Sequence, residues 1–239
     1  MVRFLSAGDT ALTVEFGETA ERRFSEAVLA LDARLAASRP PGVVELVPTL
    51  RSLTIHYDPC VTSAEELSRT VAPLLDGLER QPRRGRRWVI PVCYSPELAP
   101  DLDEVAQRSG LTPKQVVDLH TSVDYRVYML GFLPGYPYMG DVPQQLRLPR
   151  RESPRTSVPA GSVAIATTMT AVYPLDSPGG WHLIGRSPVR LFEAERDPAV
   201  LLAPGDHVRF AAITRAEFDE LERKSRAGSW LPSAQERES

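Results

Sequence analysis

Arginine and aromatic residues gather between Gly131 and Pro188, in a segment that is also dense in proline and glycine. Proline fixes the backbone angle φ and glycine permits positive φ, so this composition predicts rigid loops rather than helices. A guanidinium group can hold a carboxylate or a phosphate through two hydrogen bonds, and it stays charged at physiological pH. Aromatic side chains on such loops can form the walls of a pocket. The residues expected to contact an anionic ligand are Tyr136, Arg150, Arg155, Ser162, Trp181 and Arg186.

Two other interpretations of this segment stay open. Turns rich in proline and glycine join the strands of any β-barrel, and a loop arginine is usually only solvated. Tyrosine, tryptophan and arginine also dominate protein–protein interfaces. Consecutive backbone amides at Gly161–Ser162 and Gly179–Gly180 favour the ligand site, because such amides can form a nest for an anion.

His120 is the candidate general acid or base. We expect it at the C-terminal end of a helix that begins after Thr112, where the helix dipole favours its protonated form. The alternative is a histidine that only caps or packs the helix end. The four histidines lie in separate segments without H-x-x-x-H spacing, so no protein-bound metal is predicted.

Composition limits the classes of function. The net charge is −3, which is unlike a nucleic-acid-binding protein. The two cysteines, Cys60 and Cys93, are far apart and predict neither a disulfide framework nor a zinc site. No stretch approaches the roughly 18 apolar residues of a membrane span, and the N-terminal segment lacks the apolar core of a signal peptide. We therefore expect a cytoplasmic protein without membrane contact.

The elements that must position these residues divide into two groups. Residues 1–80 alternate strand and helix patterns, and they predict a small α+β domain with an antiparallel sheet and helices on one face. Ser63 and Glu66 have the form of a capping box at the start of a helix that reaches about Leu78. Residues 81–87 are polar and charged, and they predict a linker.

Residues 88–227 predict a mainly-β domain that forms a closed or nearly closed barrel, because short strand patterns recur between turns. Thr112, Pro113 and Gln115 predict a capped helix within it. Residues 228–239 are expected to be a disordered tail. The expected strands are Trp88–Tyr94, Tyr125–Leu130, Ser162–Thr168, Thr170–Tyr173, His182–Ile184, Val189–Phe192 and His207–Ala211.

Three long motifs carry a resemblance to a known family. They are GFLPGYPYMG at 131–140, the run PRRESPRTSVPAGSV at 149–163, and SPGGWHLIGRSP at 177–188. The chain resembles the family that includes the B subunit of bacterial 5-oxoprolinase, also known as allophanate hydrolase subunit 1 and as the sporulation-kinase inhibitor family. Shorter matches extend the resemblance to about Phe210.

The resemblance implies that the C-terminal barrel is cyclophilin-like. It also implies that the chain pairs with a homologous C subunit and, with an A subunit, opens 5-oxo-L-proline to L-glutamate at the expense of ATP. The ATP site can lie on a partner subunit. The alternative is a regulatory protein without chemistry of its own, which inhibits a sensor histidine kinase. A homodimer is compatible with either role, whereas barrel shape alone does not imply prolyl isomerase activity.

One segment departs from the family pattern, which reads G-I-A-G-x-Q-T-G after the strand that begins at Ser162. Here Met169 replaces the glutamine, and Ala164, Thr167 and Ala171 replace glycines. We expect a narrower pocket with one hydrogen-bonding group fewer, and an unchanged fold.

Overall fold

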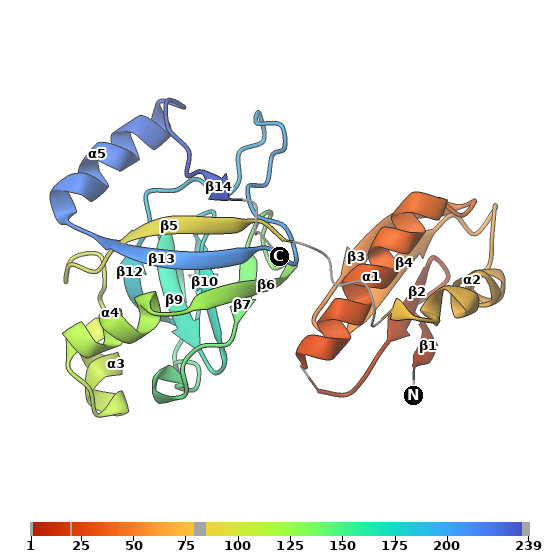
Figure 1. The fold of residues 1–239 in the computed structure, drawn as a ribbon, viewed down its shortest axis with the longest axis horizontal. Helices are drawn as coiled ribbons and strands as arrows, with labels where there is room; N and C mark the ends of the chain where they lie inside the picture. The colour runs from red at the N-terminus through yellow and green to blue at the C-terminus, as the bar shows by residue number, and fades with distance from the viewer. Residues whose placement is uncertain (1, 20, 79–84, 236–239) are drawn as a thin grey trace. The chain divides into compact units, whose positions relative to one another are not determined.

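The computed structural model describes residues 2–19, 21–78 and 85–235. The chain divides into two compact units, Met1–Arg84 and Gly85–Ser239 (Figure 1). Residues 81–84 of the predicted linker lie outside the described residues, and Arg87 is already the first residue of a strand.

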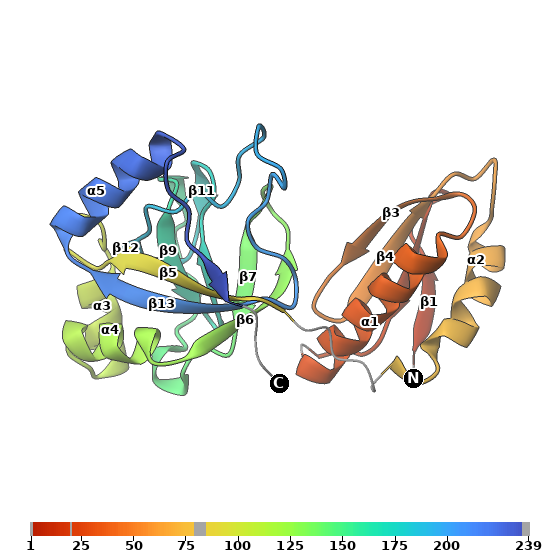
Figure 2. The same ribbon diagram turned by 45° about the horizontal axis from the view of Figure 1, so that its top comes forward.

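The N-terminal unit contains one antiparallel sheet with the strand order β1-β2-β4-β3 (Figure 2). Its strands are β1 (Arg3–Ser6), β2 (Ala11–Glu15), β3 (Val43–Pro48) and β4 (Ser52–Tyr57). The alternating residues Leu12, Val14, Leu53 and Ile55 are buried in one hydrophobic core. Side chains from two helices complete that core, so the helices cover one face of the sheet.

The helices of this unit are α1 (Arg22–Ser38) and α2 (Ala64–Val71). The Ser63 hydroxyl caps α2 by accepting a hydrogen bond from the amide of Glu66. The expectation of a helix reaching Leu78 is wrong, because α2 gives way to a 3₁₀ turn at Ala72–Leu75. Pro73 lies in that turn, and proline cannot continue the α-helical hydrogen-bond ladder.

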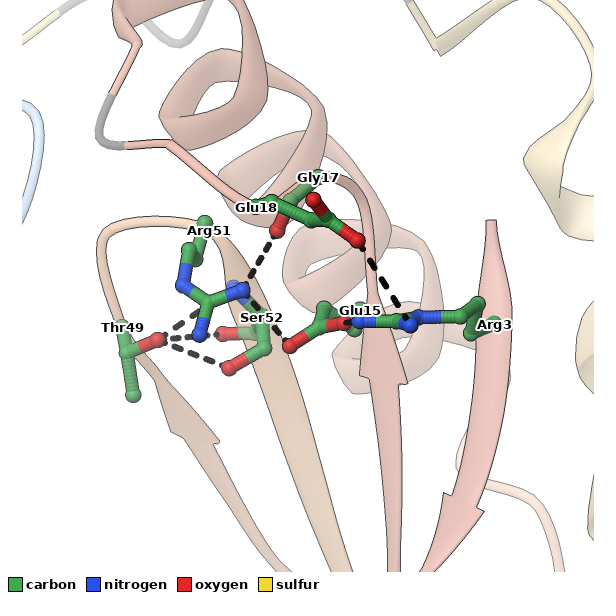
Figure 3. Close-up of polar contacts among 7 residues, drawn as sticks. All are labelled: Arg3, Glu15, Gly17, Glu18, Thr49, Arg51 and Ser52. Carbon is green, nitrogen blue, oxygen red and sulfur yellow. Dashed lines mark hydrogen bonds and ion pairs between the residues drawn. The ribbon is translucent and has the colours of Figure 1, made fainter. Parts of the chain in front are cut away.

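A carboxylate between two arginines joins the strands at one end of the sheet (Figure 3). Arg3 and Glu15 are cross-strand neighbours on β1 and β2, and Arg3 Nε lies 2.9 Å from Glu15 Oε1. Arg51 Nη1 donates to Glu15 Oε2 at 2.7 Å and to the carbonyl of Gly17 at 2.6 Å. The hydrogen bond from Arg3 is the largest of several effects that lower the pKa of Glu15.

The C-terminal unit is a closed barrel, and the predicted fold class is confirmed. Strand pairing follows the order β12-β9-β10-β7-β6-β13-β5, and the pair Arg186↔Cys93 joins β12 back to β5. The pairing of β13 with β5 is parallel, and the others are antiparallel. The strands are β5 (Arg87–Cys93), β6 (Asp124–Leu130), β7 (Pro137–Gly140), β9 (Ser162–Ala166), β10 (Met169–Val172), β12 (His182–Arg186) and β13 (His207–Ile213).

Three helices pack on the barrel: α3 (Leu102–Ser109), α4 (Pro113–Thr121) and α5 (Arg215–Arg226). The capping box predicted at Thr112 and Gln115 is confirmed. The α3 and α4 helices pack together beside β12 and β13, while α5 packs on β5 (Figure 1). No helix among the described residues is long and apolar enough to cross a membrane.

Two predictions about the C-terminal unit are wrong. Residues 189–192 form no strand, and only a single bridge joins Phe192 to Val200. The guanidinium of Arg196 instead donates to the carbonyls of Arg190, Leu191 and Ala199 at 2.9–3.1 Å, so it satisfies groups that a strand partner would otherwise bind.

The segment after Gly228 is not a disordered tail throughout. Ala234–Gln235 form β14 and pair with the edge of β5. Trp230 packs against the barrel core and holds this end of the chain to the domain. The sequence analysis also missed β7 and the small two-stranded sheet of β8 (Arg155–Val158) and β11 (Ser177–Gly179).

Candidate functional site

The candidate site lies on the outer face of strands β7, β9 and β10. Successive residues of a strand point to opposite faces, and here Val163 and Ile165 belong to the core inside the barrel. Ala164, Ala166 and Ala171 belong instead to a separate cluster that contains Tyr136, Tyr173 and Trp181. The small alanines therefore leave room for large aromatic rings on the outside of the barrel.

These rings line a pocket of about 230 Å³, which we call the aromatic pocket. Its lining consists of Phe132, Tyr136, Tyr138, Arg150, Pro154, Tyr173, Pro178, Gly179, Gly180 and Trp181. Tyr136 is the centre of the aromatic group. Its ring meets Tyr173 edge to face at 5.1 Å and Trp181 at 6.3 Å between centroids. Such geometry adds about 0.5–1.5 kcal/mol per pair beyond the burial of area, so the walls of the pocket are rigid.

The tyrosine hydroxyls of the pocket remain protonated at neutral pH. Burial raises the pKa of Tyr136, Tyr138 and Tyr173 above the ordinary value. The Tyr136 hydroxyl donates its single hydrogen to the Tyr173 hydroxyl, so the hydroxyls of Tyr138 and Tyr173 are the ones that can donate a hydrogen bond to a ligand oxygen. Gly179 is required beside Tyr173, because a β-carbon at position 179 would lie 2.3 Å from the Tyr173 hydroxyl oxygen.

Arg150 is the only cation among the described residues that line the aromatic pocket. Its Cζ lies 5.9 Å from the centroid of the Trp181 ring, within the range of a cation–π contact. No carboxylate among the described residues forms an ion pair with Arg150. This guanidinium is therefore exposed at the pocket with charge and donors available to a ligand.

Arg155 is engaged in a buried ion-pair network around Asp101. Arg155 Nη2 lies 2.6 Å from Asp101 Oδ1, and Arg151 Nη1 lies 3.1 Å from the same oxygen. The other carboxylate oxygen accepts the amide of Leu183 at 2.6 Å. Asp101 is 3% exposed. The network ties the loop before β8 to the start of α3 and to β12, which is a structural role.

Arg186 and Ser162 lie away from the aromatic pocket lining. Arg186 lines a separate groove of about 430 Å³ together with Arg190 and Arg226, and its Nε donates to the carbonyl of Ala160 at 2.9 Å. Ser162 is buried, and its amide donates to the carbonyl of Pro159. The amide of Gly161 also donates to a carbonyl, so the amide nest expected at these two residues is not formed.

His120 lies fully buried in the C-terminal unit. Thr170 Oγ1 donates its single hydrogen to the carbonyl of Ala164 at 2.9 Å, so it accepts from His120 Nε2 at 3.1 Å. His120 Nδ1 consequently accepts the Tyr94 hydroxyl at 2.8 Å.

The ring of His120 stacks on Phe210 with a centroid distance of 4.6 Å. Burial lowers its pKa to about 3, so the expectation of a protonated His120 is wrong: desolvation outweighs the helix dipole. Nor does any group of three His, Cys, Asp or Glu side chains in the described part of the chain form a metal site.

Comparison with known proteins places the chain in a family. Residues 2–202 match the family model of the carboxyltransferase domain, subdomain C and D. The B subunit of 5-oxoprolinase from Bacillus subtilis is 40% identical over 229 residues, which cover 91% of this chain and 95% of that protein. The chain belongs to the family of 5-oxoprolinase B subunits. The corresponding B subunit of Escherichia coli O157:H7 is 42% identical over 213 residues, covering 85% of this chain and 92% of its own.

Solved structures share this fold. A conserved uncharacterized protein of Pyrococcus horikoshii is 40% identical, with a TM-score of 0.55, and the match covers 90% of this chain and all of that one. The Kluyveromyces lactis urea carboxylase has a TM-score of 0.81 over 99% of this chain and 24% of its own. Its identity is 20%, so that likeness shows the fold alone.

The residues that we expect to depart from the family pattern lie beneath the aromatic rings and in the turn beside them. Ala164 and Ala171 are fully buried in the cluster beneath the aromatic rings, and Met169 packs against the same cluster. Thr167 has a φ of +53° in the turn between β9 and β10, a conformation that glycine adopts more easily. The side chains of Ala164, Met169 and Ala171 fill space under the rings, and the pairing of β9 with β10 is regular.

Two residues of the site escaped the sequence analysis. The sequence analysis gave Asp101 no role, because its partners are 50 and 54 residues away. Phe132, whose side chain is 60% exposed at the rim of the pocket, stood inside the motif GFLPGYPYMG without a separate role. The one available signal was a phenylalanine directly after Gly131 and two residues before Pro134.

Proposed function

We propose that this chain is the B subunit of a heteromeric, ATP-dependent 5-oxoprolinase that opens 5-oxo-L-proline to L-glutamate with its A and C subunits. The observation that carries the proposal is the 40% identity to the B subunit of Bacillus subtilis 5-oxoprolinase over 91% of this chain and 95% of that protein. The names of the relatives support this function and not the alternative of a kinase inhibitor.

The chemistry assigns a recognition role to the aromatic pocket. A lactam carbonyl is a poor electrophile, and transfer of a phosphoryl group from ATP to its oxygen makes the ring carbon easier for water to attack. Addition of water then allows the ring C–N bond to break, which releases the ring nitrogen as an amine and leaves γ-glutamyl phosphate, and a second water molecule hydrolyses this acyl phosphate to L-glutamate and inorganic phosphate. Of the predicted ligand residues, Tyr136, Arg150 and Trp181 share one pocket, which supports binding of the lactam there.

We expect ATP to bind outside the aromatic pocket, at a site that can lie on a partner subunit. The aromatic pocket offers one guanidinium and no lysine, which is too little positive charge for a triphosphate. Arg155 holds Asp101, Arg186 lines another groove, and both therefore act outside this pocket. A catalytic role of His120 stays a prediction, and its buried position favours a structural role.

Reconstitution tests this function. The chain is purified and mixed with the A and C subunits, and ATP-dependent release of glutamate from 5-oxo-L-proline is measured with each component omitted in turn. Glutamate that forms only in the complete mixture supports the proposal, and a complete, correctly assembled mixture without turnover refutes it. The Arg155→Ala variant is unsuitable for locating the ligand because it breaks the Asp101 network.

A further inference from the structure

The backbone at Phe132 is strained at the rim of the aromatic pocket. Phe132 has a φ of +67°, which is unusual for a bulky residue. The amide of Leu133 donates to the carbonyl of Gly131 at 2.8 Å. A turn closed between these neighbours with positive φ at its central residue is a rare and strained form of γ-turn.

The surrounding hydrogen bonds hold this strained turn in place. The amide of Gly131 donates to the carbonyl of Tyr136 at 3.1 Å, and the amide of Tyr136 donates to the carbonyl of Leu133 at 3.0 Å. The result is a large apolar side chain that is 60% exposed, while its ring meets Tyr136 edge to face at 5.4 Å. Strain that the surroundings maintain without burying the side chain is typical of functional positions.

The other features of the pocket define the ligand. Its volume of about 230 Å³ is below the roughly 300–1,000 Å³ of clefts for drug-sized ligands, so a small molecule fits. The aromatic walls favour a flat or nearly flat ring. Within the described part of the chain, Arg150 is the one guanidinium that lines the pocket and it forms no ion pair there, which favours a ligand with one carboxylate.

We infer that the aromatic pocket binds a small cyclic amide through two separate contacts: Arg150 takes its carboxylate, and Phe132 covers the ring. The inference rests on the proposed function and deepens it, because 5-oxo-L-proline combines these two groups in one molecule. Phe132 is the specificity-determining residue for the ring, and its strained backbone is what places its side chain at the rim.

The carboxylate contact is tested by comparing two ligands. Binding of 5-oxo-L-proline and of 2-pyrrolidinone, which has the same lactam ring without the carboxylate, is measured on the full chain by saturation-transfer NMR titration. The Arg150→Gln variant should lose about tenfold to hundredfold in affinity for 5-oxo-L-proline, as expected for a charge-assisted hydrogen bond. Its affinity for 2-pyrrolidinone should not change. Arg108→Gln is the matched control, because Arg108 lies beside Arg150 in a neighbouring groove and outside the aromatic pocket.

The ring contact is tested with two variants of Phe132. Phe132→Ala and Phe132→Gly should both weaken binding of 5-oxo-L-proline and of 2-pyrrolidinone, by about tenfold. Glycine adopts positive φ without strain, so Phe132→Gly should unfold about 2–4 °C above Phe132→Ala. If Phe132→Gly is more stable than Phe132→Ala and still binds the ligands more weakly than the wild type, the loss of affinity comes from the missing ring and not from a loss of stability.

The outcomes keep this inference distinct from the proposed function. Unchanged 5-oxo-L-proline affinity in Arg150→Gln, or unchanged binding of both ligands in the Phe132 variants, overturns it. So does an active reconstituted complex in which these variants keep the KM of the wild type. If the Phe132 variants lose assembly with the partner subunits and keep ligand binding, the rim is a protein–protein interface and the inference is also wrong. Failure of the complete wild-type mixture to release glutamate would refute the proposed function. The binding titrations would still test the inference about Arg150 and Phe132.

Discussion

The stability of the C-terminal unit should fall with decreasing pH because His120 is held neutral. Burial lowers the pKa of its imidazole from 6.5 to about 3. Below pH 6.5 the His120 imidazole therefore binds a proton in the unfolded chain but not in the folded chain. The contribution of His120 to the free energy of unfolding is fully present above pH 6.5. It is lost as the pH falls towards 3, with a limiting slope of about 1.4 kcal/mol per pH unit. Between pH 7.5 and pH 4.5 the loss amounts to about 2.5 kcal/mol.

The perturbation is His120→Gln, which removes the titrating group and keeps an amide that can donate and accept. Urea unfolding is followed by tryptophan fluorescence, because Trp88, Trp181 and Trp230 all lie in the Gly85–Ser239 unit. The variant loses stability at every pH through poorer packing, so only the dependence on pH is compared. The difference in the free energy of unfolding between pH 7.5 and pH 4.5 should be about 2.5 kcal/mol larger in the wild type.

Two results would refute this reasoning. One is an equal pH dependence in the wild type and in His120→Gln. The other is an NMR titration in which the His120 ring becomes protonated near pH 6.5, or in which its proton resides on Nδ1. The hydrogen bond from Thr170 to Ala164 requires the proton to be on Nε2.

Three further predictions concern Asp101, Glu15 and Gly179. Asp101→Asn leaves Arg155 without its buried carboxylate partner, and urea titrations should show a free energy of unfolding about 3 kcal/mol lower. This value is at the low end for buried ion pairs, because the Arg155 side chain is 25% exposed and water can reach it. Glu15→Gln should remove stability that is present above the ordinary pKa of a glutamate and is lost as the pH falls through the lowered pKa of Glu15; circular dichroism at pH 7 and pH 3 should show the variant and the wild type converging at the lower pH. Gly179→Ala should push the Tyr173 hydroxyl from its place, at a cost of about 1–3 kcal/mol, and weaken ligand binding, and a thermal melt with unchanged midpoint and an unchanged titration would contradict it.

The local elements could be predicted because their signals lie within a few residues. The capping box of α4 is one example, since Thr112 and Gln115 satisfy each other's backbone amides across three positions. Strand β7 escaped because Pro137 is its first residue, and proline reads as a turn signal even where it only begins a strand. Closure of the barrel through Arg186↔Cys93 joins residues 93 positions apart, which no local pattern can indicate.

The arginines show most clearly where sequence reasoning ends. In the sequence Arg150 and Arg155 are equivalent candidates, because each directly follows a proline in the same segment. In the structure the two arginines differ in their partners. The carboxylate of Asp101, 54 residues before Arg155 in the chain, binds the Arg155 guanidinium at 2.6 Å. Arg150 instead contacts the face of the Trp181 ring. A guanidinium already paired with a buried carboxylate would have to break that pair to hold a ligand, which costs more than a surface ion pair returns. We therefore expect the anion contact at Arg150, which lines the aromatic pocket and has no acidic partner among the described residues, and a substitution that tests it has to be made there.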